Sequence, residues 1–148
     1  MTLVDISELA REVVATLRHT EPEREVDIRV EDGLGATGDR ALIRAVLENL
    51  IGNAWKFTRP RNPAKIDVGR KDGAFFVRDN GVGYEPAFAA KLFQPFQRLH
   101  PSSDFPGTGI GLVSVARIVA RHGGVVRAEG AVDEGATFYF TLPERNRE

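Results

Sequence analysis

Residues 79–83, which read Asp-Asn-Gly-Val-Gly, combine a carboxylate with two glycines at the end of an apolar run. That run, Ala-Phe-Phe-Val at 74–77, predicts a buried strand that ends at Asp79. An ionised aspartate accepts hydrogen bonds and donates none, which suits an exocyclic amino group such as that of adenine. Gly81 and Gly83 would let the backbone approach a flat ligand. The alternative is a β-hairpin, because Asn-Gly is a strong turn signal, but the following Tyr-Glu-Pro at 84–86 is a poor second strand.

A polar stripe lies along the helix expected at 39–57. Asn49, Asn53 and Lys56 are spaced i, i+4 and i+7, so they share one face for about two turns. An asparagine oxygen can bind a hard cation such as Mg²⁺, and a lysine supplies a point charge for phosphate. The alternative is an ordinary solvated face. Two asparagines flanked by core positions favour the binding interpretation, because asparagine is a poor helix former.

A glycine-rich run at 107–112, Gly-Thr-Gly-Ile-Gly-Leu, opens a helix expected from Leu112 to His122. Unpaired amide groups and the positive end of the helix dipole then come together, which makes an anion site. The run could also be only a flexible joint. It is not the dinucleotide-binding fingerprint, because no strand precedes it within a βαβ unit.

The segment 93–106 has no clean period and holds three phenylalanines and three prolines. Long irregular connections in compact domains are typically lids or binding loops, and a disordered linker would not normally carry three phenylalanines. We interpret this segment as a lid hinged on its aromatic residues. Arg98 and His100 could reach phosphates from it, and plain solvent exposure is the alternative for both.

The elements that position these residues are indicated by caps, periods and turns. Asp5 and Asp39 are good N-caps, and Glu8 completes a capping box with Asp5. Helices are expected at 5–20, 39–57, 86–92 and 112–122. Strands are expected at 26–30, 34–37, 65–70, 74–79, 125–129 and 137–142, with a tight turn at 71–73. The core face of the second helix is assigned to Leu42, Val46, Leu50 and Phe57, with Leu47 and Ile51 beside it.

Composition excludes several classes of protein. The 148 residues fit one domain, and a net charge of −1 gives no case for binding nucleic acid or an anionic membrane. The absence of cysteine excludes disulfides, thiolate metal sites and a cysteine nucleophile, and is compatible with the cytoplasm. No apolar run reaches membrane-spanning length. There is no Walker lysine motif, no His-Arg-Asp loop of Ser/Thr/Tyr kinases and no cluster with zinc spacing.

Five motifs in order resemble the catalytic ATP-binding domain of bacterial sensor histidine kinases, in the superfamily with gyrase, Hsp90 and MutL. Residues 48–58 resemble the asparagine box, 79–83 the first glycine box and 93–98 the phenylalanine box. Residues 107–112 resemble the second glycine box, and 135–138 the last one. Phe-Gln-Arg-Leu-His at 96–100 and Arg-Ile-Val-Ala-Arg-His-Gly-Gly at 117–124 also resemble kinases linked to phytochrome-like or PAS sensors.

The resemblance implies an α+β fold, a two-layer α/β sandwich of the Bergerat type. A mixed, mostly antiparallel sheet would be covered on one face by helices, with an ATP lid. The implied cofactors are ATP and Mg²⁺, with Asn53 as the metal ligand and Asp79 on the adenine amino group. The implied catalytic residues are Asn49, Lys56 and Arg98. The remaining implied nucleotide-binding residues are Gly81, Gly83, Gly107, Gly109, Gly111, Leu112 and Thr137, the last supporting adenine from the Asp79 side.

The position of Asn49 is a glutamate that activates water in the family's ATPases. Asparagine there favours phosphoryl transfer to a histidine over hydrolysis. Glu48 is a weaker candidate base, because a neighbouring helix position faces about 100° away.

The family's phosphoacceptor box is missing, since His19 is followed by Thr-Glu-Pro. Residues 1–148 are therefore expected to form one catalytic domain without the dimerisation domain. The implied partners are ATP or ADP, a histidine-bearing dimerisation domain and a response regulator receiver domain. The isolated chain is expected to be a cytoplasmic monomer with little autophosphorylation and no contact with nucleic acid or membrane. The alternatives are a stand-alone anti-sigma-type serine kinase and an ATP-sensing interaction module of the same fold.

Overall fold

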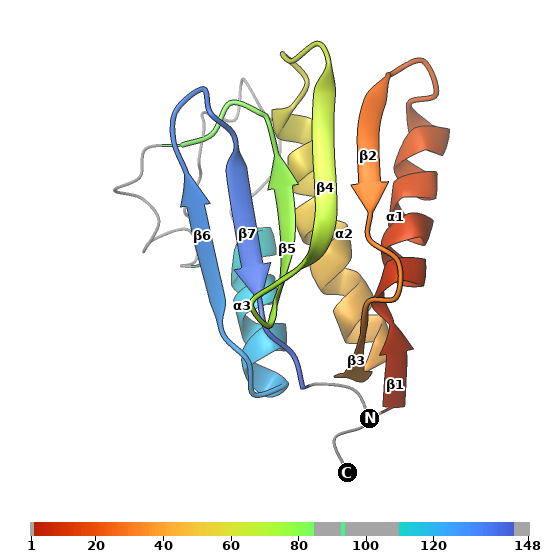
Figure 1. Cartoon of the computed structure of the whole chain (residues 1–148), viewed down its shortest axis with the longest axis vertical. Helices are drawn as coiled ribbons and strands as arrows, with labels where there is room; N and C mark the ends of the chain where they lie inside the picture. Colours follow the sequence, from red (N-terminus) through yellow and green to blue (C-terminus); the bar gives the residue numbers. More distant parts are fainter. Residues whose placement is uncertain (1, 85–92, 94–109, 144–148) are drawn as a thin grey trace.

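Three helices cover one face of a five-stranded sheet in the computed structural model, which describes residues 2–84, 93 and 110–143 (Figure 1). The described elements are β1 (Thr2–Asp5), α1 (Ile6–Thr20), β2 (Val26–Val30), β3 (Gly35–Gly38), α2 (Arg40–Phe57), β4 (Ala64–Lys71), β5 (Ala74–Asp79), α3 (Ile110–Arg121), β6 (Val126–Gly130) and β7 (Ala136–Phe140). This architecture confirms the predicted two-layer α+β class. The helix expected at 86–92 and all of the expected lid after Phe93 lie outside the described residues.

The sheet is mixed and mostly antiparallel, as predicted. Its strand order is β2-β4-β5-β7-β6, with β2 and β4 parallel and the other three neighbouring pairs antiparallel. β1 and β3 form a separate antiparallel ribbon. Between β4 and β5, Asp72 and Gly73 have φ of 53° and 82°, the left-handed pair that a tight hairpin turn requires. β5 is therefore the central strand, and Asp79 is its last residue.

The helices begin at the predicted caps. An Asp5 side-chain oxygen accepts a hydrogen bond from the Glu8 amide at 2.9 Å, and Asp39 accepts one from the Leu42 amide at 3.1 Å. Each bond satisfies one of the amides that a helix start leaves unpaired. α3 ends before Gly123, whose φ of 79° is the left-handed conformation of a glycine cap.

The buried face of α2 agrees with the predicted one at Val46, Leu47, Leu50 and Ile51 and differs from it at two positions. Leu42 and Phe57, both assigned to the core, are only half-buried. The buried residues are Ile43, Val46, Leu47, Leu50, Ile51, Ala54 and Trp55. The difference arises because α2 lies between α1 and α3 and also packs on the sheet. A helix with neighbours on three sides buries a wider part of its surface than a single amphipathic stripe.

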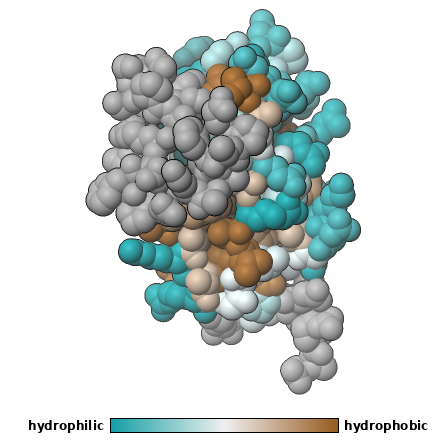
Figure 2. Space-filling view, turned by 90° about the vertical axis from the view of Figure 1, so that its left-hand side faces the viewer, coloured by the Kyte–Doolittle hydropathy of each residue, from teal (hydrophilic) through white to brown (hydrophobic). Residues whose placement is uncertain are grey.

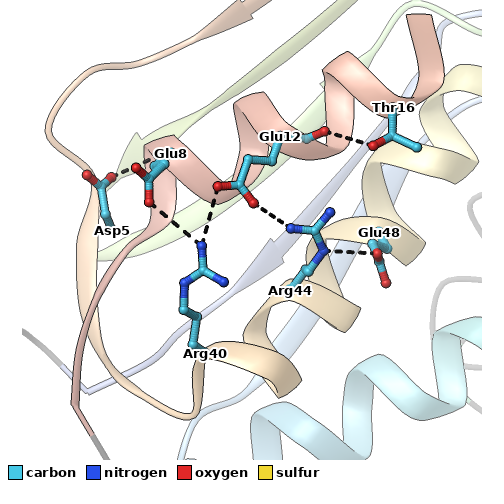
Figure 3. Close-up of polar contacts among 7 residues, drawn as sticks. All are labelled: Asp5, Glu8, Glu12, Thr16, Arg40, Arg44 and Glu48. Atoms are coloured by element: carbon cyan, nitrogen blue, oxygen red, sulfur yellow. Dashed lines mark hydrogen bonds and ion pairs between the residues drawn. The ribbon is translucent and has the colours of Figure 1, made fainter. Parts of the chain in front are cut away.

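Charged side chains line the outer seam between α1 and α2 (Figure 3). Arg40 lies 3.7 Å from Glu8 and 3.4 Å from Glu12. Arg44 contacts Glu12 at 2.5 Å and Glu48 at 3.2 Å. These pairs are largely exposed, so the apolar contacts beneath them contribute most of the stability of the seam.

The described surface carries few large apolar side chains. Those that stand exposed among the described residues are Leu3, Val125 and Val132. Figure 2, seen from the side where β6 forms the edge of the sheet, shows one group of hydrophobic residues just below the middle of the view and another near its top, with hydrophilic residues along the right-hand side. None of the helices within the described ranges combines the length and the apolar character needed to cross a membrane.

Candidate functional site

Asp79 ends the central strand as a buried carboxylate. It is 6% exposed and lies on the same face of β5 as Phe75 and Val77, the face toward the helices. Its Oδ1 atom accepts a hydrogen bond from the Gly81 amide at 2.8 Å. Burial raises the pKa of Asp79 to about 6, although hydrogen bonds from the Gly81 and Ala136 amides act in the opposite direction. The carboxylate keeps acceptor capacity for a ligand that approaches from the helix side.

The structure gives a steric reason for glycine at positions 81 and 83, which the sequence did not show. A Cβ on Gly81 would lie 2.4 Å from the Phe57 carbonyl oxygen, which also accepts the Val82 amide at 3.1 Å. Gly83 has a φ of 67°, and its Cβ would lie 1.8 Å from the Ala131 carbonyl oxygen. The loop after Asp79 is thus held between the end of α2 and the β6–β7 turn. β5 already pairs with β4 on one side and with β7 on the other, so the chain cannot turn back on β5 as a hairpin after Asp79, and this alternative interpretation of Asn-Gly is wrong.

The β6–β7 turn packs closely against this loop at Gly135, the first residue of the last glycine box. Its φ is 84°, and a Cβ there would lie 2.1 Å from the Asp79 carbonyl oxygen. The Asp133 amide donates to the Val82 carbonyl at 2.7 Å. Both contacts fix the backbone of the Asp79 loop from the side opposite α2.

Asn80, directly after β5, and Arg61, in the connection between α2 and β4, make contacts at the site that sequence reasoning missed. Asn80 binds this connection, because its side chain accepts from the Lys65 amide and donates to the Pro63 carbonyl, both at 2.9 Å. Arg61 donates to the Asn80 carbonyl at 2.8 Å and to the Gly81 carbonyl at 3.1 Å. No periodic pattern covers this two-proline connection, so the sequence carries no signal for these contacts.

The predicted polar stripe on α2 is half-buried along its length, at Asn49, Asn53 and Lys56. The Asn49 amide nitrogen donates to the Ala45 carbonyl at 2.9 Å, so its oxygen is the atom directed away from that carbonyl. The Lys56 ammonium lies 5.7 Å from the centre of the Phe57 ring. α2 packs against β5, which brings the helix that carries this stripe to the strand that ends in Asp79.

Glu48 lies on the α1 side of α2 and contacts Arg44 (Figure 3). Its carboxylate is exposed and ion-paired outside the Asn49–Asn53 face. This placement agrees with its low rank as a base.

The glycine run and the start of the expected lid are described only in part. Arg98, Gly107 and Gly109 lie outside the described residues. Gly111 belongs to the first turn of α3, and Leu112, at 7% exposure, packs in the core. The Phe93 ring lies edge-on to that of Phe138, with centroids 6.4 Å apart. This contact anchors the first residue of the expected lid on β7.

Thr137 is not brought to Asp79. The β5–β7 register pairs Asp79 with Ala136 and places Thr137 opposite Arg78. Since successive strand residues point to opposite faces, the Thr137 side chain lies on the outer face, away from the helices. Ala136 occupies the position beside Asp79 that had been assigned to Thr137.

His122 joins the two helices that carry predicted site motifs. It is buried, its Nδ1 lies 2.8 Å from the Ile118 carbonyl oxygen, and its Nε2 accepts a hydrogen bond from the Asp39 amide at 3.1 Å. The end of α3 is therefore tied to the N-cap of α2. The sequence indicated only that His122 ends a helix.

The structure has a helix layer over a mixed sheet and a buried carboxylate at the end of the central strand, beside the helix that carries Asn49 and Asn53, which is the arrangement expected from the resemblance to histidine kinase ATP-binding domains. The chain belongs to the family of histidine kinase-, DNA gyrase B- and HSP90-like ATPases, whose model matches residues 38–146.

Known relatives extend this assignment. The chain is 35% identical over 149 residues to the phytochrome-like protein Cph1 of Synechocystis sp., covering 99% of this chain and 20% of that protein. It thus spans about a fifth of that relative's length. A structure of the mycobacterial sensor histidine kinase MprB matches with a TM-score of 0.80 and 25% identity, over 97% of this chain and 98% of that one. Full-length ShkA in complex with AMPPNP matches with a TM-score of 0.74 and 33% identity, over 95% of this chain and 30% of that one. The resemblance to histidine kinases, including phytochrome-like ones, is confirmed.

Proposed function

We propose that this chain is the ATP-binding catalytic domain of a two-component sensor histidine kinase. In this role it donates the γ-phosphoryl group of ATP to a histidine on a separate dimerisation domain, for transfer to a response regulator receiver domain. The observation that carries the proposal is the buried Asp79 carboxylate at the end of β5. Its remaining acceptor capacity matches the exocyclic amino group of adenine, and the ATP analogue named with ShkA is of the same class.

Asn53 fits a Mg²⁺ that arrives with the nucleotide. Within the described ranges, no three His, Cys, Asp or Glu residues gather as a metal cage. Mg²⁺ keeps several waters and is commonly held by few protein groups together with substrate phosphates, so one amide oxygen suits it. Bound there, the ion would neutralise charge that develops on the phosphates. Asn49 would line the same wall, and Lys56 would place a positive charge near the phosphates.

Transfer forms a bond between a histidine ring nitrogen and the γ-phosphorus while the bond to the β–γ bridging oxygen breaks and ADP leaves. This chemistry needs positioning and charge stabilisation more than a base. A neutral amide at Asn49 cannot take a proton from water, which favours transfer over hydrolysis. Arg98 stays a predicted stabiliser of the γ-phosphoryl charge.

The transfer is tested with the isolated histidine-bearing dimerisation domain of a sensor histidine kinase, supplied in trans with γ-labelled ATP. We expect acid-labile phosphohistidine on that domain. Asn53→Ala should lower the rate by about ten- to thirtyfold, because the metal loses its protein ligand. Glu48→Gln is the matched control on the same helix and should leave the rate unchanged. ATP binding without any phosphohistidine would favour the ATP-sensing module, and phosphoserine on a partner would favour the serine kinase.

Nucleotide affinity should fall as the pH drops through about 6, where Asp79 gains a proton. The protonated carboxyl is a weaker acceptor for the adenine amino group than the carboxylate. The dissociation constant of Mg·ATP measured from pH 7.5 to pH 5 should therefore rise below pH 6. The phosphates of ATP also titrate in this pH range. The Asp79→Asn variant is therefore the control, because asparagine does not titrate and any pH dependence of its ATP affinity comes from the phosphates. Identical pH profiles for the two proteins would contradict this role of Asp79.

A further inference from the structure

Arg61 binds backbone carbonyls on two segments that meet beside Asp79. Its Nε atom donates to the Asn80 carbonyl oxygen at 2.8 Å, and its Nη2 atom donates to the Gly81 carbonyl oxygen at 3.1 Å. The same Nη2 atom lies 3.2 Å from the Asp133 carbonyl oxygen in the β6–β7 turn. The side chain is 29% exposed, so most of it is enclosed by the groups that it binds.

These contacts form a relay through a single peptide group. The Asn80 carbonyl and the Gly81 amide belong to the same planar unit. Arg61 binds the oxygen end of this unit, and the Asp79 carboxylate accepts from its nitrogen end at 2.8 Å. A cation on the oxygen polarises the peptide and strengthens the bond from its N–H group. Arg61 therefore sets both the orientation and the donor strength of the amide that binds Asp79.

We propose that Arg61 is a positioning residue for nucleotide recognition, acting through the Asn80–Gly81 peptide to hold the Asp79 carboxylate toward the adenine amino group. The inference rests on the proposed function, because it takes Asp79 as the group that recognises adenine. It adds a residue that lies outside the five sequence motifs.

The guanidinium fork is the feature that the contacts require. Arg61 reaches three carbonyl oxygens with donors set in one plane, whereas a lysine presents a compact point charge. The ion pair between Arg61 and the Asp133 carboxylate contributes little to this arrangement. Arg61 Nη2 and Asp133 Oδ1 are 3.4 Å apart, and the Asp133 side chain is 78% exposed.

A double-mutant cycle on Mg·ATP binding, measured by calorimetry, tests the proposal. Arg61→Ala should weaken ATP binding by about tenfold, because the carboxylate loses its fixed orientation. Arg61→Lys should restore part of the loss. In the Asp79→Asn background, Arg61→Ala should cost less than about twofold, because the group through which it acts is absent.

Arg59→Ala is the matched control in the same connection. Arg59 forms a two-point ion pair with Glu21, both contacts at 2.7 Å, and does not contact the Asp79 loop. Its loss should leave the ATP dissociation constant unchanged, even where it lowers the melting temperature.

Two outcomes would overturn the proposal while leaving the proposed function intact. One is wild-type affinity for ATP in a folded Arg61→Ala protein, and the other is an equal loss in the wild-type and Asp79→Asn backgrounds. If Arg61→Ala does not fold, the cycle is run with Arg61→Lys, where full additivity has the same meaning. Failure of the wild-type protein to bind ATP is separate, because it would overturn the proposed function itself.

Discussion

Asp79→Asn should weaken Mg·ATP binding by about ten- to a hundredfold and at the same time stabilise the nucleotide-free protein. The loss of affinity corresponds to about 1.5–3 kcal/mol, the value of a hydrogen bond to a charged acceptor. An asparagine can also turn its NH₂ group toward the adenine amino group, where two donors would face each other. Calorimetric titration with Mg·ATP, and with Mg·GTP as a control ligand, measures this loss.

The gain in stability follows from the pKa of Asp79, which burial raises from 3.8 to about 6. The folded state holds the proton more tightly than the unfolded state, so the stability of the wild-type protein falls as the pH rises from about 4 to about 6. Above that window the buried charge costs up to about 3 kcal/mol, which the neutral asparagine avoids. Urea unfolding should show the variant as the more stable protein at pH 7, with the difference vanishing below pH 4.

Asp67→Asn is the control for both measurements, because Asp67 lies half-buried on β4 and outside the site. It should leave ATP affinity unchanged. Equal affinity of the wild-type protein for ATP and GTP would remove Asp79 from adenine recognition while keeping a phosphate site. A variant less stable than wild type at pH 7 would show that Asp79 contributes a net stabilising contact in the absence of nucleotide.

Gly83→Ala should destabilise the fold by at least about 3 kcal/mol, as measured by the free energy of unfolding in urea. Two costs combine at this position. The φ of 67° is left-handed, and the new Cβ would lie 1.8 Å from the Ala131 carbonyl oxygen, a backbone atom that cannot turn away. The β6–β7 turn must then move off the Asp79 loop.

Gly33→Ala separates these two costs. Gly33 has a similar φ of 77°, but a Cβ there meets no atom within 4 Å. This variant should lose only about 1–2 kcal/mol, the price of the left-handed conformation. Equal losses in the two variants would mean that the close approach of the β6–β7 turn to Gly83 contributes nothing to stability.

Local chemistry explains which parts of the fold were predictable. Helix caps and tight turns depend on residues within four positions of one another, so they can be predicted from the local sequence. This holds for the caps at Asp5 and Asp39 and for the turn at Asp72-Gly73. Leu42 and Phe57 were predicted as core residues of α2 and are half-buried, with Leu42 packed against the core, because the buried face of this helix depends on α1, α3 and the sheet at once. No local period contains that information.

The site shows the same division. Asp79, Asn49, Asn53 and Lys56 were predicted as site residues from residue type and spacing, and the structure places Asp79 in the buried class and the other three in the half-buried class. Arg61 was missed because its partners lie 19, 20 and 72 positions away along the chain. Thr137 was misplaced because a shift of one residue along a strand reverses the face to which a side chain points.

Two of the contacts at the junction around the Asp79 loop join main-chain atoms alone. The Phe57 carbonyl meets the Val82 amide, and the Val82 carbonyl meets the Asp133 amide. Any residue other than proline offers these same groups, so the chemical identity of the side chains at 57, 82 and 133 is largely irrelevant to the joint. The constraint falls instead on the places where a side chain must be missing, at 81, 83 and 135. The geometry of this junction can therefore tolerate many changes of side chain at 57, 82 and 133, provided that 81, 83 and 135 stay glycine and that Arg61 and Asn80 keep their contacts.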